Sequence, residues 1–266
     1  MQKTEIASYL DAIELKPKSV YVVHEKLERS LPLHSHSKSQ LTYVDGGIAY
    51  IFIGEKTYFI PARHYIWIPR GLPHYVKVRT SATITRNLYF YTEDDHTNTF
   101  YSKFGIYPVN NLLFEMIGFT NKWSGYIEKK DEGYNFMAAI KNILPQMSIK
   151  SFPIALPTTT NTKLRPIVLY MAQNFGQQIT LDNIATRFGM GERTLSRLFQ
   201  STMNISFLQY LKLLRIVRAI EMILQDDYTT TEIAYLTGYN SLAAFSKAFF
   251  QVTNIRPSDF NKQNRQ

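Results

Sequence analysis

The chain has 266 residues, of which 45% are hydrophobic, and this length suits two domains that each bury a core. It contains no cysteine, which excludes a disulfide framework and a thiolate metal site and favours a reducing, cytoplasmic compartment. No apolar run is long enough for a membrane span, and residues 1–18 lack the apolar core of a signal peptide, so we expect a soluble protein without a membrane partner.

The charge balance favours a polyanionic partner. The formal net charge is +9, and from Asn161 onward the chain holds 12 Lys/Arg against 7 Asp/Glu. The C-terminal part is the shorter one, so its positive density is the higher. A basic surface of this kind attracts nucleic acid, although many basic surfaces are only solvated.

Short strands are predicted across residues 20–90. Several runs rich in Val, Ile, Tyr and Phe are separated by Gly- and Pro-containing turn signals, which is typical of an antiparallel sandwich or barrel. These runs are VYVVHE, QLTYV, IAYIFI, KTYFI, HYIWI, HYVKV and TITRNLYFY.

Histidines follow a recognisable spacing in this segment. His34 and His36 are two residues apart, so they share one face of a strand, and Gln40 and Gly46 follow. A second group, Pro69–His74, ends in a histidine that a later strand places near the first two. The segment resembles a cupin, a jelly-roll barrel with an H-x-H-x3-E…G motif and a P-x-G-x-x-H motif.

Two interpretations of this site stay open. Neutral imidazoles beside an oxygen suit Zn, Fe, Ni or Mn, so three histidines are candidate ligands of a divalent metal. The resemblance departs at Gln40, where metal-binding cupins carry glutamate, and an amide oxygen is a weaker ligand. The alternative is a metal-free pocket for a small effector, and no cofactor is firmly implied. The effector-site candidates are His34, His36, Gln40, Tyr43, Trp67 and His74, and the aromatic members are also typical of plain core.

Two helices are predicted after the strands, over residues 110–119 and 134–144, with Pro145 ending the second. This helix pair either caps the barrel or pairs with a second subunit, which leads us to expect a homodimer. Two prolines and a polar run then mark a segment without helix or strand periodicity. We therefore predict a sensor or dimerisation domain over residues 1–150, a linker over 151–161 and a second domain over 162–266.

The C-terminal domain repeats one design twice. Thr180–Ser206 and Thr229–Pro257 match at an offset of 49 before the turn and 50 after it, so the second copy has one added residue in its turn. Each copy reads as a short helix, a glycine turn at Gly189 or Gly238, and a second helix. A 19-residue amphipathic helix over residues 207–225 joins them. We predict an all-α domain with two helix-turn-helix motifs.

The exposed faces of the two second helices predict DNA recognition. A helix-turn-helix places such a helix in the major groove, where arginine reads guanine through two hydrogen bonds. The first copy offers Arg193, Thr194, Ser196 and Arg197. The second offers Asn240, Ser241, Ala243, Ala244 and Lys247. Because the second copy has no arginine on this face, we expect the first to dominate base readout and the second to contribute to positioning.

A row of cations lies on the connecting helix. Lys212, Arg215 and Arg218 step by three residues along one side. This spacing fits either a track of phosphate contacts or a solvated face.

Residues 161–262 resemble the DNA-binding domain of the AraC/XylS transcription regulators. The closing stretch IAYLTGYNSLAAFSKAFFQVTNIRPSDF is similar to the family pattern of an I-A pair, a G-Y/F-x-S turn, F-x-R/K-x-F-K/R and G-x-S/T-P. Phe250 replaces the usual basic residue, Asn254 the usual glycine and Arg256 the usual Ser/Thr. The resemblance implies double-stranded DNA, a small-molecule effector and RNA polymerase as partners, an activator by family habit, and no enzymatic activity. Two alternatives remain: a metal-dependent cupin enzyme fused to a DNA-binding domain, or a barrel that only dimerises.

Overall fold

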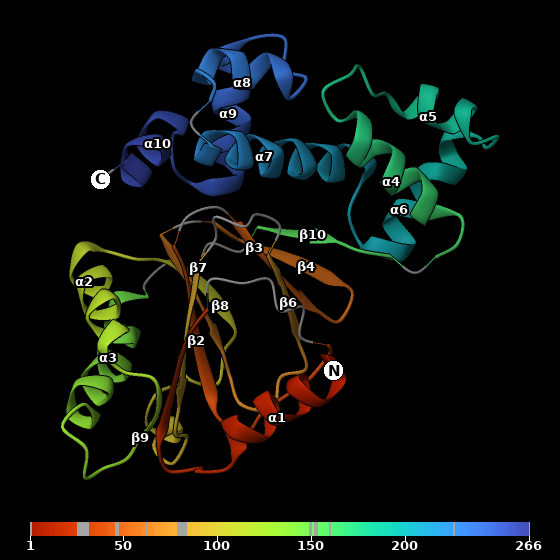
Figure 1. Ribbon diagram of the computed structural model, residues 1–266. Coiled ribbons are helices and arrows are strands. Elements are labelled where there is room, and N and C mark those ends of the chain that lie inside the picture. Colours follow the sequence, from red (N-terminus) through yellow and green to blue (C-terminus); the bar gives the residue numbers. More distant parts are fainter. Residues whose placement is uncertain are drawn as a thin grey trace. The chain divides into compact units, whose positions relative to one another are not determined.

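The protein is described by a computed structural model (Figure 1) that covers residues 2–25, 32–45, 48–61, 63–78, 84–148, 151, 154–159, 161–225 and 227–265. Gly46 and parts of the predicted linker lie outside these residues. The chain divides into two compact units, Met1–Gly54 with Ile60–Pro153, and Glu55–Phe59 with Ile154–Gln266. The first unit is rich in strands and the second in helices, so the predicted α+β, two-domain class is confirmed.

The predicted strands are all present in antiparallel sheets. They are β1 (Val20–Glu25), β2 (Ser39–Asp45), β3 (Ile48–Ile53), β4 (Lys56–Pro61), β5 (His64–Ile68), β6 (Tyr75–Val78) and β7 (Ile84–Phe90). Three short strands were not predicted: β8 (Gly105–Pro108), β9 (Gly125–Ile127) and β10 (Ala155–Pro157). The strand orders are β8-β5-β2-β7-β1-β9 and β10-β4-β3-β6. β10 corrects the prediction that residues 151–161 hold no strand. Its three residues pair with β4, and backbone pairing rather than a side-chain pattern defines it.

Helices α2 (Asn111–Phe119) and α3 (Tyr134–Met147) lie beside the six-stranded sheet (Figure 1). Alternate residues of β1, β2, β5 and β7 face them and form a buried cluster with Leu113, Ile117, Met137, Ile140 and Leu144. The strand members of this cluster are Val20, Val22, Leu41, Tyr43, Tyr65, Trp67, Leu88 and Phe90. Because side chains alternate along a strand, Gln40, Thr42, Asn87 and Tyr89 belong to the opposite face.

The prediction that Pro145 ends the second helix was wrong. The helix continues to Met147 with Pro145 inside it. Proline lacks the N–H that would bond the carbonyl four residues earlier, which belongs to Lys141. Tyr101 donates its hydroxyl to that carbonyl at 3.1 Å, so the freed acceptor is satisfied from outside the helix. Because Tyr101 satisfies this carbonyl, the helix can continue past Pro145.

An N-terminal helix, α1 (Gln2–Glu14), was not predicted. It packs against the sheet through Tyr9 and Ile13, which are buried with Tyr89. The hydroxyls of Tyr9 and Tyr89 lie 3.0 Å apart in a hydrogen bond. The helix thus covers the face that carries Gln40 and Thr42.

The second unit contains the expected helical repeat. Its helices are α4 (Leu164–Asn174), α5 (Leu181–Arg187), α6 (Glu192–Met203), α7 (Phe207–Gln225), α8 (Thr230–Leu236), α9 (Leu242–Thr253) and α10 (Pro257–Arg265). The predicted bounds of α7 are confirmed at both ends. In the part of the chain that is described, no helix has both the length and the apolar character to cross a membrane.

Candidate functional site

The two helix-turn-helix motifs, α5–α6 and α8–α9, have matching backbones. Gly189 and Gly238 both adopt a positive φ, of 65° and 83°, where a side chain would be strained. The next residue in each copy donates its N–H back into the first helix, Met190 to the Ala185 carbonyl at 2.9 Å and Tyr239 to the Ala234 carbonyl at 3.0 Å. The repeated sequence therefore builds the same turn twice.

Asn240 is the residue added in the second turn. Met190 and Tyr239 are equivalent at an offset of 49, whereas the N-caps of α6 and α9, Gly191 and Ser241, are equivalent at an offset of 50. The Ser241 hydroxyl accepts from the backbone N–H of Ala244 at 3.2 Å. Ser241 therefore caps α9, and a serine cap stabilises a helix by about 1 kcal/mol relative to alanine.

The outer face of α6 carries the polar side chains predicted to read DNA. Arg193, Thr194, Ser196 and Arg197 are exposed, while Leu195 and Phe199 are fully buried. Within the described residues, neither arginine side chain has a hydrogen bond or an ion pair. Two guanidinium groups one helical turn apart are therefore available to an anionic or acceptor-rich partner.

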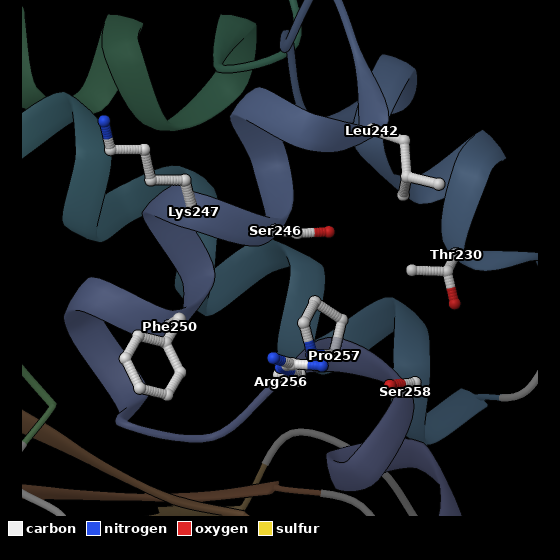
Figure 2. A pocket seen from close by; sticks show the side chains of 8 residues that line it. All are labelled: Thr230, Leu242, Ser246, Lys247, Phe250, Arg256, Pro257 and Ser258. Atoms are coloured by element: carbon white, nitrogen blue, oxygen red, sulfur yellow. The ribbon is translucent and has the colours of Figure 1, made fainter.

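The equivalent face of α9 is less polar. Ala243, Ala244 and Lys247 are exposed, as predicted, and Leu242 and Phe250 are also 40% and 50% exposed. Beside this face a groove of about 610 Å³ runs between α9 and the starts of α8 and α10 (Figure 2). Its lining is Thr230, Leu242, Ser246, Lys247, Phe250, Arg256, Pro257 and Ser258. The second motif thus presents apolar surface where the first presents Glu192 and Gln200.

Two of the three cations in the row Lys212, Arg215 and Arg218 on α7 bind groups of the protein itself, so at these positions the row is neither a phosphate track nor a solvated face. Arg215 donates to the carbonyls of Phe175 and Gln177 at 3.0 and 2.9 Å, and its guanidinium lies over the Tyr239 ring. Arg218 forms an ion pair with Glu221 at 2.7 Å. Arg215 therefore connects the end of α4 to the second motif, and Arg218, whose guanidinium lies over the Phe175 ring, contacts the same end of α4. Helical spacing alone does not reveal these roles.

In the first unit, the three predicted histidines come together. His34 and His74 pair across an antiparallel bridge, and their ring centroids lie 4.5 Å apart. The His36 ring lies 5.9 Å from His34 and 5.1 Å from His74. One ring nitrogen of each histidine falls within 4.8 Å of the others. The three histidines therefore lie together, as their spacing in the sequence predicts.

Burial sets the charge of this cluster. It lowers the pKa of His34, His36 and His74, and for His74, which also faces the other two rings, the pKa falls to about 3. All three imidazoles are consequently neutral at pH 7. Neutral imidazoles keep one lone pair each for a hydrogen-bond donor or a metal ion.

A polar network continues from the cluster. Gln40 lies between the His36 ring, at 2.9 Å, and Thr42, at 2.7 Å. Thr42 bonds Asn87 at 2.7 Å, and the His36 ring packs edge-on against Tyr89. Thr42, Asn87 and Tyr89 were missed by the sequence analysis. Counting in twos along the strand from Gln40 would have found Thr42.

Tyr43 and Trp67 lie on the other face of the sheet. Both are buried in the cluster against α2 and α3, and the indole nitrogen of Trp67 donates to the Tyr101 carbonyl at 3.1 Å. The structure therefore places these two effector-site candidates in the core, away from the histidines.

Comparison with known proteins covers both units. A model of the AraC-like ligand binding domain matches residues 18–95, and a helix-turn-helix domain model matches residues 184–263. The HTH-type transcriptional regulator NimR of Escherichia coli is 25% identical over 222 residues, which cover 84% of this chain and 79% of that protein.

Two further relatives match over shorter spans. The HTH-type transcriptional regulator GbdR of Pseudomonas aeruginosa is 34% identical over 38% of this chain, and this chain spans 28% of its length. The HTH-type transcriptional activator RhaS of Salmonella newport is 27% identical over 59% of each chain. An AraC-like ligand-binding domain followed by a repeated helix-turn-helix identifies the chain as a member of the AraC family of DNA-binding transcriptional regulators.

Proposed function

We propose that the protein binds specific DNA sites through both helix-turn-helix motifs and that an effector in the N-terminal unit controls this binding. The observation that carries the proposal is the pair of exposed arginines on α6, within a motif whose backbone recurs in α8–α9. Arg193 and Arg197 read bases, with Thr194 and Ser196 beside them. Asn240, Ser241, Ala243, Ala244 and Lys247 position the second motif along the backbone and against thymine methyls.

For the first unit we propose a binding role without catalysis. The hydrogen-bonded set of His36, Gln40, Thr42 and Asn87 offers hydrogen-bond donors and acceptors that suit a bound small molecule. We further propose a cytoplasmic activator that contacts RNA polymerase. The family resemblance and the activating role of the relative RhaS, an HTH-type transcriptional activator, support this assignment.

Replacing Arg193 or Arg197 with alanine is expected to remove roughly 1–3 kcal/mol of discrimination between the specific site and random DNA. Salt-sensitive general binding should persist, because phosphate contacts elsewhere still release counterions. The specific site is first selected from random duplexes with the unaltered protein, and competition binding then gives the discrimination. Arg165→Ala, which removes an exposed arginine from α4, is the matched control. Unchanged discrimination in both α6 variants would remove these residues from base readout.

We also propose that the protein forms a homodimer through α2. Leu112 and Phe119 are seven residues apart, so they share a face of this helix, and each is 52% exposed. Leu112→Glu combined with Phe119→Glu is expected to shift the mass measured by light scattering from dimer to monomer. Leu169→Glu, at another exposed leucine, should leave the mass unchanged. A wild-type protein that is monomeric at micromolar concentration would contradict this assignment.

A further inference from the structure

Backbone hydrogen bonds to Nδ1 fix the orientation of the three histidine rings. Each Nδ1 lies beside a backbone carbonyl two residues away: His34 at 2.8 Å from Pro32, His36 at 2.6 Å from Lys38, and His74 at 2.8 Å from Leu72. A carbonyl only accepts, so Nδ1 carries the proton in each neutral ring. The lone pair of each ring is therefore on Nε2. This backbone anchoring is the usual arrangement behind histidines that bind metals.

Two of these lone pairs have no partner. Nε2 of His34 and Nε2 of His74 are buried and make no hydrogen bond to any of the described residues. A buried acceptor without a donor costs free energy, and polar side chains that stay buried in this state point to an absent ligand or ion.

The Gln40 side chain adds a fourth candidate. Its Oε1 lies 2.9 Å from Nε2 of His36, although neither atom carries a proton in this arrangement. Two ligand atoms that bind one transition metal at right angles, each about 2.1 Å from it, stand roughly 3 Å apart. The separation therefore fits neighbouring ligands of one cation. The rival explanation is a reversed Gln40 amide whose nitrogen donates to His36.

We propose that the N-terminal unit binds one divalent transition-metal ion through Nε2 of His34, His36 and His74, with Oε1 of Gln40 as the fourth ligand. Three imidazoles and an amide favour Zn²⁺, Ni²⁺ or Co²⁺ over Mg²⁺ and Ca²⁺, which prefer oxygen ligands. The set carries no negative charge, so binding is weaker than at a site with a carboxylate and is reversible. If the proposed function holds, the ion is the effector or part of its site.

Binding also requires a small movement. The ring nitrogens all lie within 4.8 Å of one another, and the ligands of one transition-metal ion stand roughly 3–3.5 Å apart. Any pair of nitrogens near the upper limit would therefore move closer together when the ion binds. His34 lies in an isolated bridge and His74 directly precedes β6, so the contraction acts on the link between two chain segments.

The test uses Co²⁺ alone as the probe, added to the full-length protein after chelator treatment. We expect a saturable visible absorption band with one ion per chain. His34→Ala and His74→Ala should weaken binding at least tenfold. His96→Ala, which removes an exposed histidine outside the cluster, should bind like the unaltered protein. Native tryptophan fluorescence of each variant, together with the milder His34→Asn, separates loss of ligand from loss of fold.

A second pair of variants separates the metal site from a purely structural cluster. Gln40→Glu adds a charged oxygen at the fourth position and is expected to tighten Co²⁺ binding by about tenfold. Gln40→Leu should weaken it. No uptake of Co²⁺, Ni²⁺ or Zn²⁺ by the folded protein, or equal uptake by the histidine variants, would overturn the proposal. Because uptake is measured without DNA, its failure leaves the DNA-binding proposal intact, and a failure to bind DNA leaves the metal site intact.

Discussion

Lys141→Ala is expected to destabilise the N-terminal unit by about 3–5 kcal/mol, the cost of removing one partner from a buried ion pair. Lys141 lies on α3 and is fully buried. Its ammonium forms an ion pair with Asp95 at 2.7 Å and another with Asp94, and it donates to the Tyr91 carbonyl at 2.7 Å. A domain is typically stable by 5–15 kcal/mol, so this loss is a large fraction of the total.

The location of Lys141 explains why alanine is poorly tolerated. The ammonium lies 4.4 Å from the centre of the Tyr91 ring and 5.0 Å from that of Tyr101, so the side chain joins α3 to the segment after β7. Alanine would leave Asp95, whose other carboxylate oxygen is held by Ser39 at 2.8 Å, as a largely buried charge with one partner fewer. It would also leave a cavity between two aromatic rings.

Tryptophan fluorescence can isolate this effect. The two tryptophans of the chain, Trp67 and Trp123, both belong to the first unit, so their emission during urea unfolding reports that unit alone. Lys129→Ala, a matched change at an exposed lysine, should shift stability by less than about 0.5 kcal/mol. Lys141→Met combined with Asp95→Asn should recover part of the loss, because it removes both charges. An unfolding midpoint for Lys141→Ala equal to that of Lys129→Ala would show that the pair contributes little.

Local patterns predicted the elements whose cause is local. The strands from β1 to β7 follow alternation and turn residues, and α7 follows its apolar stripe from Phe207 to Gln225. Thr229 and Glu232 have the spacing of a capping box, which is a local pattern, and both of its hydrogen bonds are present. The same holds for the histidine cluster, because the motif spacing fixes which face each ring occupies.

What sequence could not predict depends on contacts between distant residues. β10 exists because Ala155–Pro157 pairs with β4, and α3 passes Pro145 because Tyr101 satisfies the freed carbonyl. Tyr43 and Trp67 were predicted as pocket residues because the sequence of an aromatic-rich strand does not show which of its faces packs in the core and which faces the pocket. The arginines of α7 were the hardest case: an exposed-looking cation at helical spacing gives no sign of carbonyl partners some 40 residues away.

Arg215→Ala is expected to cost the C-terminal unit about 2–4 kcal/mol and to uncouple its two motifs. A hydrogen bond from a charged donor contributes roughly 1.5–3 kcal/mol, and Arg215 makes two, to the carbonyls of Phe175 and Gln177. The bond to Gln177 is exposed to solvent and contributes less than the bond to Phe175. Its guanidinium also lies 5.6 Å from the centre of the Tyr239 ring, next to the turn glycine of the second motif. A Cβ on Gly238 would approach the guanidinium to 2.6 Å, so the two fit closely.

The expected effect on DNA binding follows from this geometry. Two motifs on one rigid connection bind adjacent groove segments as a single ligand, and the second contact benefits from a high effective concentration. When α4, α7 and the second turn are no longer tied together, that benefit falls. Footprinting should then show continued protection of the segment bound by α6 and weakened protection of the segment bound by α9. Far-ultraviolet circular dichroism, to which the helical C-terminal unit contributes most, gives the stability.

Two outcomes distinguish this coupling role from direct contact with phosphate. If Arg215 bound a phosphate, its loss would weaken binding uniformly across sequences and reduce the salt slope by about one, with stability unchanged. If it ties the motifs together, stability falls and protection is lost unevenly, while the salt slope changes little. Arg165→Ala, an exposed arginine on α4, is the control for removing one positive charge from this unit. A uniform loss of DNA affinity with unchanged stability would show that Arg215 contacts phosphate and does not tie the motifs together.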